Sequence, residues 1–224
     1  MAKNFNSPQV VEHYDHHIRQ LIPGYELVHQ QILSLLETHL DQSCKIAVIG
    51  CGTGYELSYL LDAFPKGKFI ANDPSSEMIK KARELVISKN ALDRVEFFQD
   101  DTSILKNYSC EFDATISILV AHFIAFESKN LFFNDIYQSL KPKGVCISFD
   151  LMQFKSEQEK QYLFNLVQYS GLNETQSKKM LERLNDDFEL IDINQAFEIL
   201  RLQGFDKIQT FSQILNFYGL ISTK

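Results

Sequence analysis

The sequence lacks several features that mark common protein classes. Its four cysteines form no C-x-x-C pair, so we expect reduced thiols in a cytoplasmic protein. The longest apolar run, residues 116–126, is interrupted by Ser117 and His122 and is too short to span a bilayer. No secretory signal is visible at the amino end. The net charge of −7 argues against nucleic acid as a partner, because binding to phosphates needs positive charge.

Three glycine-containing motifs with known chemistry are also absent. There is no G-x-x-x-x-G-K-[ST] phosphate loop and no G-x-S-x-G nucleophile turn. The dinucleotide motif G-x-G-x-x-G fails as well, because its third glycine, counted from Gly50, falls at Tyr55. These absences argue against a P-loop nucleotide hydrolase, an α/β-hydrolase and a nicotinamide-dependent dehydrogenase.

A short apolar stretch followed by closely spaced glycines is present instead. Residues 46–49 are all apolar, and Gly50, Gly52 and Gly54 follow with Cys51 between the first two. Leucines then recur at helical spacing over 55–64. This pattern predicts a buried parallel strand, a turn and a helix. Glycines without Cβ let a ligand approach the backbone amides of such a turn.

An acidic residue follows the next expected strand. Residues 68–72 read as a strand that ends at Asp73-Pro74, about 20 residues beyond the glycines. A carboxylate at this position can accept two hydrogen bonds from the hydroxyls of a ribose. The alternative interpretation makes Asp73 the N-cap of a helix that begins near Ser76. The position favours ribose binding.

The G-x-G-x-G turn and the acidic residue after it resemble the class I S-adenosylmethionine-dependent methyltransferases. The resemblance implies an α/β fold: a Rossmann-like, doubly wound seven-stranded sheet with one antiparallel strand. The chain would form one domain with a helical cap (1–40), a cofactor-binding core (41–150), an inserted helical lid (151–190), and a final helix with two closing strands (191–224). S-adenosylmethionine would be the cofactor, and a small molecule the methyl acceptor.

The same resemblance assigns further cofactor contacts. Met78 would lie against the adenine, and Asp101, after the strand 95–98, would accept the adenine amine with Thr102 beside it. Asp100 competes for that role, and two adjacent aspartates also suit a solvated turn. Ile118, at the end of the strand 112–118, would lie near the methionine part. The predicted cofactor set is Tyr25, Gly50, Cys51, Gly52, Gly54, Asp73, Pro74, Met78, Asp101, Thr102 and Ile118.

Within this class, the chain is most similar to the carboxy-S-adenosylmethionine synthases, from Tyr14 to Ser222. The triplet 23–25, Pro-Gly-Tyr, implies a cofactor contact for Tyr25, although a buried amphipathic tyrosine is the simpler interpretation. Lys178 stands where the synthases have a lid arginine, Ile118 where they have an asparagine, and Val48 where methyltransferases often have an acid. We therefore interpret the chain as a relative of the synthases, and the resemblance also makes a homodimer plausible.

Residues near the ends of the fourth and fifth expected strands are candidates for catalysis. His122 follows the strand 112–118 in an otherwise apolar segment, so it is either a core residue or a general base. Tyr14 and Asp150 are further candidates. The lid carries Lys178, Lys179 and Arg183, of which we expect Lys178 and Arg183 to face the substrate. His13, His16 and His17 share helical spacing, but no other ligands accompany them, so we predict no metal.

Three functions remain compatible with these residues. The first is methyl transfer to a small molecule whose identity the sequence does not reveal. The second is synthesis or use of carboxy-S-adenosylmethionine, with Lys178 binding the carboxylate. The third is a non-catalytic protein that binds S-adenosylmethionine.

Overall fold

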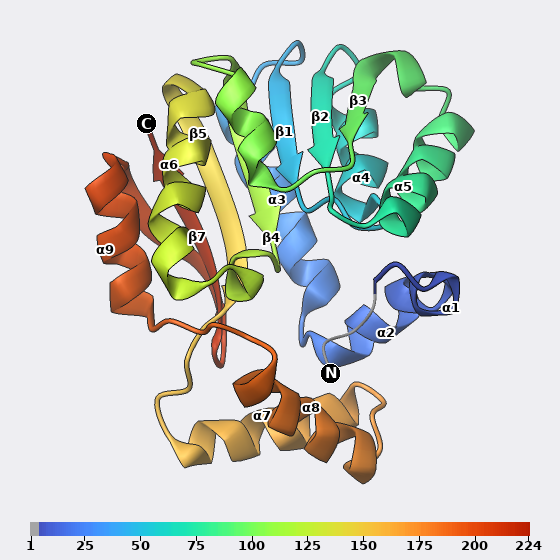
Figure 1. The fold of residues 1–224 in the computed structure, drawn as a ribbon, viewed down its shortest axis with the longest axis vertical. Coiled ribbons are helices and arrows are strands. Elements are labelled where there is room, and N and C mark those ends of the chain that lie inside the picture. Colours follow the sequence, from blue (N-terminus) through green and yellow to red (C-terminus); the bar gives the residue numbers. More distant parts are fainter. Residues whose placement is uncertain (1–4) are drawn as a thin grey trace.

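The computed structural model describes residues 5–224, apart from the side chain of Asn185; residues 1–4 of the expected cap lie outside the described residues. A seven-stranded sheet in the order β3-β2-β1-β4-β5-β7-β6 forms the centre of the fold (Figure 1). Its strands are β1 (Lys45–Ile49), β2 (Lys68–Asn72), β3 (Val95–Phe98), β4 (Phe112–Ile118), β5 (Leu140–Leu151), β6 (Asp206–Ile214) and β7 (Phe217–Thr223).

Strands β1 to β5 run parallel, and β7 is antiparallel to both of its neighbours. This is the predicted doubly wound sheet with one reversed strand. The connection between β6 and β7 is too short for a parallel crossover, so the last strand must reverse. The sequence-based fold prediction is therefore confirmed.

Helices cover both faces of the sheet, because the residues of the central strands are apolar on both faces. One core contains Ile46, Val48 and Ile116 and packs under α3 (Tyr25–His39), α4 (Tyr55–Ala63) and α5 (Ser76–Ser88). The other contains Ala47 and Ile49 and packs under α6 (Lys129–Ser139) and α9 (Ile193–Gln203). Parallel strands buried on both faces read as continuous apolar runs, as this sequence does.

The remaining helices lie beyond the carboxyl ends of the parallel strands. Figure 1 shows α1 (Pro8–Glu12) and α2 (Tyr14–Leu21) on one side of this edge, and α7 (Glu157–Tyr169) and α8 (Glu174–Asp186) below it. The sheet edge, the cap helices and the lid helices thus face a common space. Within residues 5–224, no helix combines the length and apolar character needed to cross a membrane.

Several boundaries differ from the sequence-based prediction. The first helical stretch is divided at His13, which separates α1 from α2. The two closing strands meet at a two-residue turn, Leu215 and Asn216, across which Ile214 at the end of β6 pairs with Phe217. Leu215 has a φ of 53°, which the alternation of apolar residues could not predict.

The predicted turn at 141–144 forms a bulge inside β5. Leu140 pairs with Phe112, and the ladder resumes where Val145 pairs with Ala114. Lys143 has a φ of 69°, a conformation that favours glycine. A Cβ at Gly144 would lie 2.9 Å from the carbonyl oxygen of Lys141, so this position requires glycine. Four 3₁₀ turns, η1 (Leu92–Arg94), η2 (Thr102–Asn107), η3 (Ala121–Phe123) and η4 (Phe126–Ser128), were not predicted.

Candidate functional site

The glycine turn lies at the carboxyl end of β1, as predicted. Gly50, Gly52 and Gly54 all have positive φ values, of 65°, 50° and 87°. A Cβ at Gly50 would clash with Val120 at 2.5 Å, and one at Gly54 would lie 3.1 Å from the Cα of Ala82. A Cβ at Gly52 would meet no atom within 4 Å. Gly50 and Gly54 therefore permit close packing, whereas Gly52 borders open space where a ligand can reach the backbone.

Asp73 connects this turn to the end of β2. Its carboxylate accepts the backbone N–H of Gly52 at 3.0 Å and that of Ser75 at 2.8 Å. Burial raises the pKa of this carboxyl, and the two backbone hydrogen bonds oppose that shift. The helix cap, the alternative interpretation of Asp73, belongs to Ser75, whose hydroxyl accepts the N–H of Met78 at 3.2 Å. A carboxylate has about four acceptor positions, so two remain for a ribose.

The end of β3 lies next to this position. Asn72 donates its side-chain amide to the carbonyl oxygen of Asp100 at 3.0 Å, which fixes the loop after β3. The exposed Asp101 accepts the N–H of Ser103 at 2.8 Å and caps the 3₁₀ turn that starts at Thr102. Met78 is buried in the first turn of α5. The predicted adenine contacts thus lie at neighbouring strand ends, with Asp101 engaged as a cap.

The cap is tied directly to the glycine turn. Asp15, in the first turn of α2, accepts the hydroxyl of the buried Thr53 at 2.5 Å. Tyr14 precedes Asp15, and burial together with the charges of Glu56 and Asp73 raises the pKa of its hydroxyl. Asp15 was not predicted, and its carboxylate on a polar helix face gave no signal of this contact.

Tyr25 lies at the start of α3, behind the glycine turn. Its ring packs against His29 and Tyr55, with centroid distances of 4.4 and 5.4 Å. The Arg19 guanidinium lies 5.3 Å from the centre of the same ring. Burial raises the pKa of the Tyr25 hydroxyl. The tyrosine predicted from the Pro-Gly-Tyr triplet is therefore a buried aromatic residue within the cluster that supports the turn.

The structure brings two of the three catalytic candidates together. The His122 Nδ1 is hydrogen-bonded to Asp150 Oδ1, and both side chains are buried. Asp150 also accepts the backbone N–H groups of Ala121 at 2.6 Å and Leu151 at 2.9 Å. A carboxylate held in this way accepts only, so Nδ1 carries the proton of the neutral ring. Nε2 is then the nitrogen that can accept a proton.

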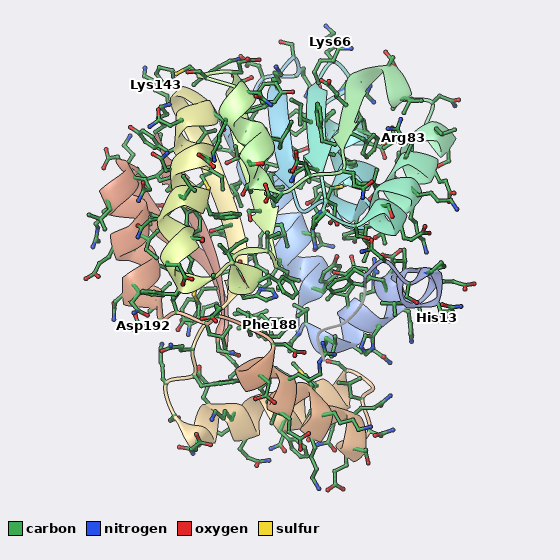
Figure 2. All side chains as sticks on the ribbon, viewed as in Figure 1. His13, Lys66, Arg83, Lys143, Phe188 and Asp192 are labelled. Carbon is green, nitrogen blue, oxygen red and sulfur yellow. The ribbon has the colours of Figure 1, made fainter. Side chains whose placement is uncertain are left out.

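Other contacts hold the turn that carries His122. Lys129 donates to the carbonyl oxygens of Ala121 at 2.6 Å and Ile124 at 2.8 Å, and burial lowers the pKa of its ammonium. The backbone N–H of Glu189 donates to the carbonyl oxygen of His122 at 2.9 Å. Phe188 packs edge-on against the His122 ring at 4.6 Å. Figure 2 shows Phe188 between the lid helices and the sheet.

A cavity of about 310 Å³ lies between the cap, the η3 turn and the lid. Most of its lining is apolar or aromatic, and none of its lining residues is acidic. Small-molecule sites commonly start near this volume. The lining residues are Phe5, Tyr14, His17, Ile18, Leu21, Ile22, Leu119, His122, Phe123, Leu151, Leu172, Gln176, Lys179, Met180, Arg183, Leu184, Phe188 and Phe217.

Three predicted site residues line this cavity: His122, Tyr14 and Arg183. None of the predicted cofactor residues does, so the cavity lies beside the glycine turn rather than above it. Lys178 does not line it either; this exposed lysine pairs with Glu174 at 2.6 Å. Its neighbour Lys179 lines the cavity instead. Lys179 shares a helical face with Gln176 and Arg183, which also line the cavity, and this i, i+3, i+7 spacing was the signal that could have separated the two lysines.

The histidines considered for a metal are dispersed. His13 lies between α1 and α2 and is exposed, as Figure 2 shows at the margin of the molecule. His17 lines the cavity. Among residues 5–224, no three His, Cys, Asp or Glu side chains are arranged to hold a metal ion.

Comparisons with known proteins agree with this geometry. Residues 46–144 match the methyltransferase domain family. The chain therefore contains a methyltransferase domain, and its fold is that of the class I S-adenosylmethionine-dependent methyltransferases. The carboxy-S-adenosyl-L-methionine synthase of Cronobacter sakazakii is 27% identical, over 96% of this chain and 89% of that protein.

Two solved structures have the same fold as this chain. A possible exported protein of Bordetella parapertussis aligns with a TM-score of 0.68 and 19% identity, over 88% of this chain and 66% of that one. Human N-acetylserotonin methyltransferase aligns with a TM-score of 0.65 and 16% identity, over 98% of this chain and 57% of that one.

The residues around the glycine turn fit S-adenosylmethionine, the cofactor of this class. The open space at Gly52 admits a ligand to the backbone, and Asp73 keeps acceptor positions for a ribose. Three carboxylates, those of Asp15, Glu56 and Asp73, lie close together. All three raise the pKa of the Tyr14 hydroxyl, and Asp15 and Asp73 also raise the pKa of the Glu56 carboxyl. Such a site suits a ligand with positive charge, which the sulfonium and ammonium groups of this cofactor provide.

Proposed function

We propose that this methyltransferase transfers a methyl group to a small-molecule acceptor bound in the cavity between cap and lid, with His122 as general base. The observation that carries the proposal is the position of His122. Its ring is oriented by Asp150 and lines a cavity that lies directly beside the glycine turn. A base must reach the proton that it removes, and this ring is the buried base of that cavity.

The chain's own residues have three tasks in this reaction. S-adenosylmethionine supplies an activated methyl group, whose carbon–sulfur bond breaks as the bond to the acceptor forms. Asp150 fixes the tautomer of His122, and Nε2 takes the acceptor's proton. Phe123 and Phe188 flank the His122 ring at 4.3 and 4.6 Å and keep water from it. The cap and lid hold the acceptor in line, which is the largest contribution for a methyl group already activated.

The base role is tested with His122→Asn and Asp150→Asn. We expect His122→Asn to lower kcat by about 10²- to 10⁴-fold, with an unchanged Kd for S-adenosylhomocysteine. The acceptor comes from a screen in which transferred methyl is detected by mass spectrometry. His16→Asn, an exposed histidine on α2, is the matched control and should leave kcat unchanged.

Two outcomes would contradict the base role. Unchanged kcat for His122→Asn would remove the histidine from proton transfer. An equal loss for His122→Asn at every pH between 6 and 9, together with weakened cofactor binding, would indicate a structural role instead. Binding of cofactor without turnover on any acceptor would support a non-catalytic protein.

A second candidate is the synthesis or use of carboxy-S-adenosylmethionine. It is favoured by the likeness to synthases and by two cations that line the cavity, Lys179 and Arg183, of which Arg183 also pairs with Asp187 at 2.7 Å. Lys178, the residue first proposed for this role, pairs with Glu174 instead. Mass spectrometry of ligand extracted from the purified protein separates the candidates. The carboxylated cofactor favours this one, and ordinary cofactor or S-adenosylhomocysteine favours methyl transfer.

The cellular location and the oligomeric state of the protein are also proposals. None of the four cysteines forms a disulfide in the part of the chain described, which agrees with a reducing, cytoplasmic environment. A homodimer is proposed from the resemblance alone and is tested by light scattering. Amide exchange of the cap and lid helices, measured with and without ligands, tests the division of one domain into cap, core, lid and closing strands.

A further inference from the structure

Glu56 is a buried carboxylate that the reaction described above does not use. It lies in the first turn of α4, directly after the glycine turn, and its side chain is 10% exposed. Its carboxylate accepts a hydrogen bond from its own backbone N–H, and within residues 5–224 no other residue donates to it, whereas Asp73 accepts the backbone N–H groups of two other residues. A buried carboxylate without such partners is costly, so its presence beside a ligand site calls for an explanation.

The charges around Glu56 are negative rather than positive. Burial raises the pKa of its carboxyl to about 7; the hydrogen bond from its own backbone N–H opposes this shift, and the charges of Asp15 on α2 and Asp73 after β2 add to it. His29 Nδ1 lies 3.9 Å from Glu56 Oε1. Burial lowers the pKa of His29 to about 4, so its ring is neutral at pH 7 and the contact is not an ion pair. No cation therefore compensates Glu56 within the described residues.

The other groups that face Glu56 are uncharged. Tyr14 on α2, Tyr25 on α3 and Tyr59 on α4 all have pKa values raised by burial and by the Glu56 charge. The thiol of Cys51 in the glycine turn is affected in the same way. Val48, which stands two residues before Gly50 in β1, is buried and carries no charge. Glu56 is thus the buried acidic residue in the first turn of the helix that follows the glycine turn.

We propose that Glu56 binds the α-ammonium of the amino-acid part of S-adenosylmethionine. The inference rests on the proposed function only in taking this cofactor as the ligand. The ammonium has three donors and a full positive charge, so it suits a buried carboxylate whose hydrogen bond comes only from its own backbone N–H within the described residues. The sulfonium donates no hydrogen bond, and the ribose hydroxyls are matched by Asp73. The ammonium is the cofactor group that matches Glu56.

The assignment predicts which ligands depend on Glu56. S-adenosylhomocysteine has the ammonium but no sulfonium, and 5′-methylthioadenosine has neither. For Glu56→Gln, we expect the Kd of S-adenosylhomocysteine to rise about 10- to 100-fold, as for loss of a charged hydrogen bond. The Kd of 5′-methylthioadenosine should change less than about threefold, since its adenosine group does not reach Glu56. Both are measured by calorimetry at pH 8, where Glu56 is ionised.

Two variants serve as controls for this measurement. Glu37→Gln removes an exposed glutamate of α3 and should leave both Kd values unchanged. Asp73→Asn removes the ribose contact and should weaken both ligands alike. Circular dichroism verifies folding, and Glu56→Asp, which keeps the charge, should lose less affinity than Glu56→Gln.

The outcomes separate this inference from the proposed function. If the unaltered protein binds neither ligand, the cofactor assignment fails. If it binds both and Glu56→Gln keeps its affinity for S-adenosylhomocysteine, the Glu56 assignment alone is wrong. Equal weakening of both ligands by Glu56→Gln would also overturn it, because the effect would then not depend on the amino-acid group.

Discussion

Glu56 and Asp73 are two carboxylates of one ligand site with different surroundings. Asp73 accepts two backbone N–H groups, which oppose the effect of burial on its pKa. Glu56 has negative neighbours, and its pKa rises to about 7. A group with such a raised pKa destabilises the folded, ligand-free protein when it ionises, because the unfolded chain releases the proton more easily. Binding and stability therefore make opposite demands on Glu56.

The first prediction concerns stability against pH. Between pH 4.5 and 7 the folded state holds the Glu56 proton longer than the unfolded state, so the free energy of unfolding falls as pH rises. We expect ligand-free Glu56→Gln to be more stable than the unaltered protein at pH 8 by about 2–3 kcal/mol, and nearly equal at pH 4.5. Urea unfolding at both pH values measures the difference.

Because His29 also titrates in this range, the free energy of unfolding must be compared between Glu56→Gln and the unaltered protein at the same pH, rather than between pH values for one protein. The pKa of His29 is lowered from 6.5 to about 4, so its contribution to stability is lost as pH falls from 6.5 to 4. This slope opposes that of Glu56 over much of the same range. It cancels when Glu56→Gln is compared with the unaltered protein at each pH. A difference that does not vary with pH would show that Glu56 is ionised throughout.

The second prediction separates two glycines of the turn. Gly52→Ala places a Cβ in open space, and Gly54→Ala places one 3.1 Å from the Cα of Ala82. Both have positive φ, which costs alanine about 1–2 kcal/mol. We expect Gly52→Ala to lower cofactor affinity more than stability, and Gly54→Ala to lower stability more. Calorimetry with S-adenosylhomocysteine and urea unfolding measure the two effects. Unchanged affinity of Gly52→Ala would show that its Cβ does not meet the ligand, and equal losses of stability would show that Ala82 gives way to the Cβ at position 54.

At the scale of elements, the family resemblance implied the seven-stranded sheet, and apolar periodicity was enough to locate its first four strands, at 46–49, 68–72, 95–98 and 112–118. It worked because strands buried on both faces cannot be polar. It failed where backbone conformation decides, as at Leu215 and Lys143, whose positive φ values no pattern of apolar residues encodes. It also failed for single polar residues. Lys178 and Lys179 are identical in chemistry, and only the rotation of α8 distinguishes them.

The third prediction follows from that rotation. Lys179 lines a mostly apolar cavity, and Lys178 pairs with Glu174 on the outer side of the same helix. If the acceptor carries an anionic group, Lys179→Ala should raise its KM about tenfold, as for one charged hydrogen bond. Lys178→Ala should leave KM unchanged, and it is a natural control one residue away. A larger effect of Lys178→Ala would show that α8 turns when the acceptor binds.

At the scale of the whole molecule, the site is assembled from parts distant in sequence. The cap contributes Tyr14 and Asp15, the sheet contributes the glycine turn and Asp73, and the lid closes the neighbouring cavity. The sequence indicated each part by its position relative to strand ends. It could not indicate contacts between them, such as that of Asp15 with Thr53, because those depend on how separate elements pack.

The last prediction is that ligands protect these parts in a fixed order. Binding of S-adenosylhomocysteine at 100 times its Kd should stabilise the protein by about 2.7 kcal/mol, or roughly 5–10 °C in Tm. Because Asp15 joins α2 to the glycine turn, amide exchange in α2 should slow with this ligand alone. Exchange in α8 should slow further only when the acceptor fills the cavity that α8 lines. Hydrogen exchange with mass spectrometry resolves the two helices. Protection of α8 by the first ligand alone, without change in α2, would place the cofactor in the cavity and contradict the division of the site.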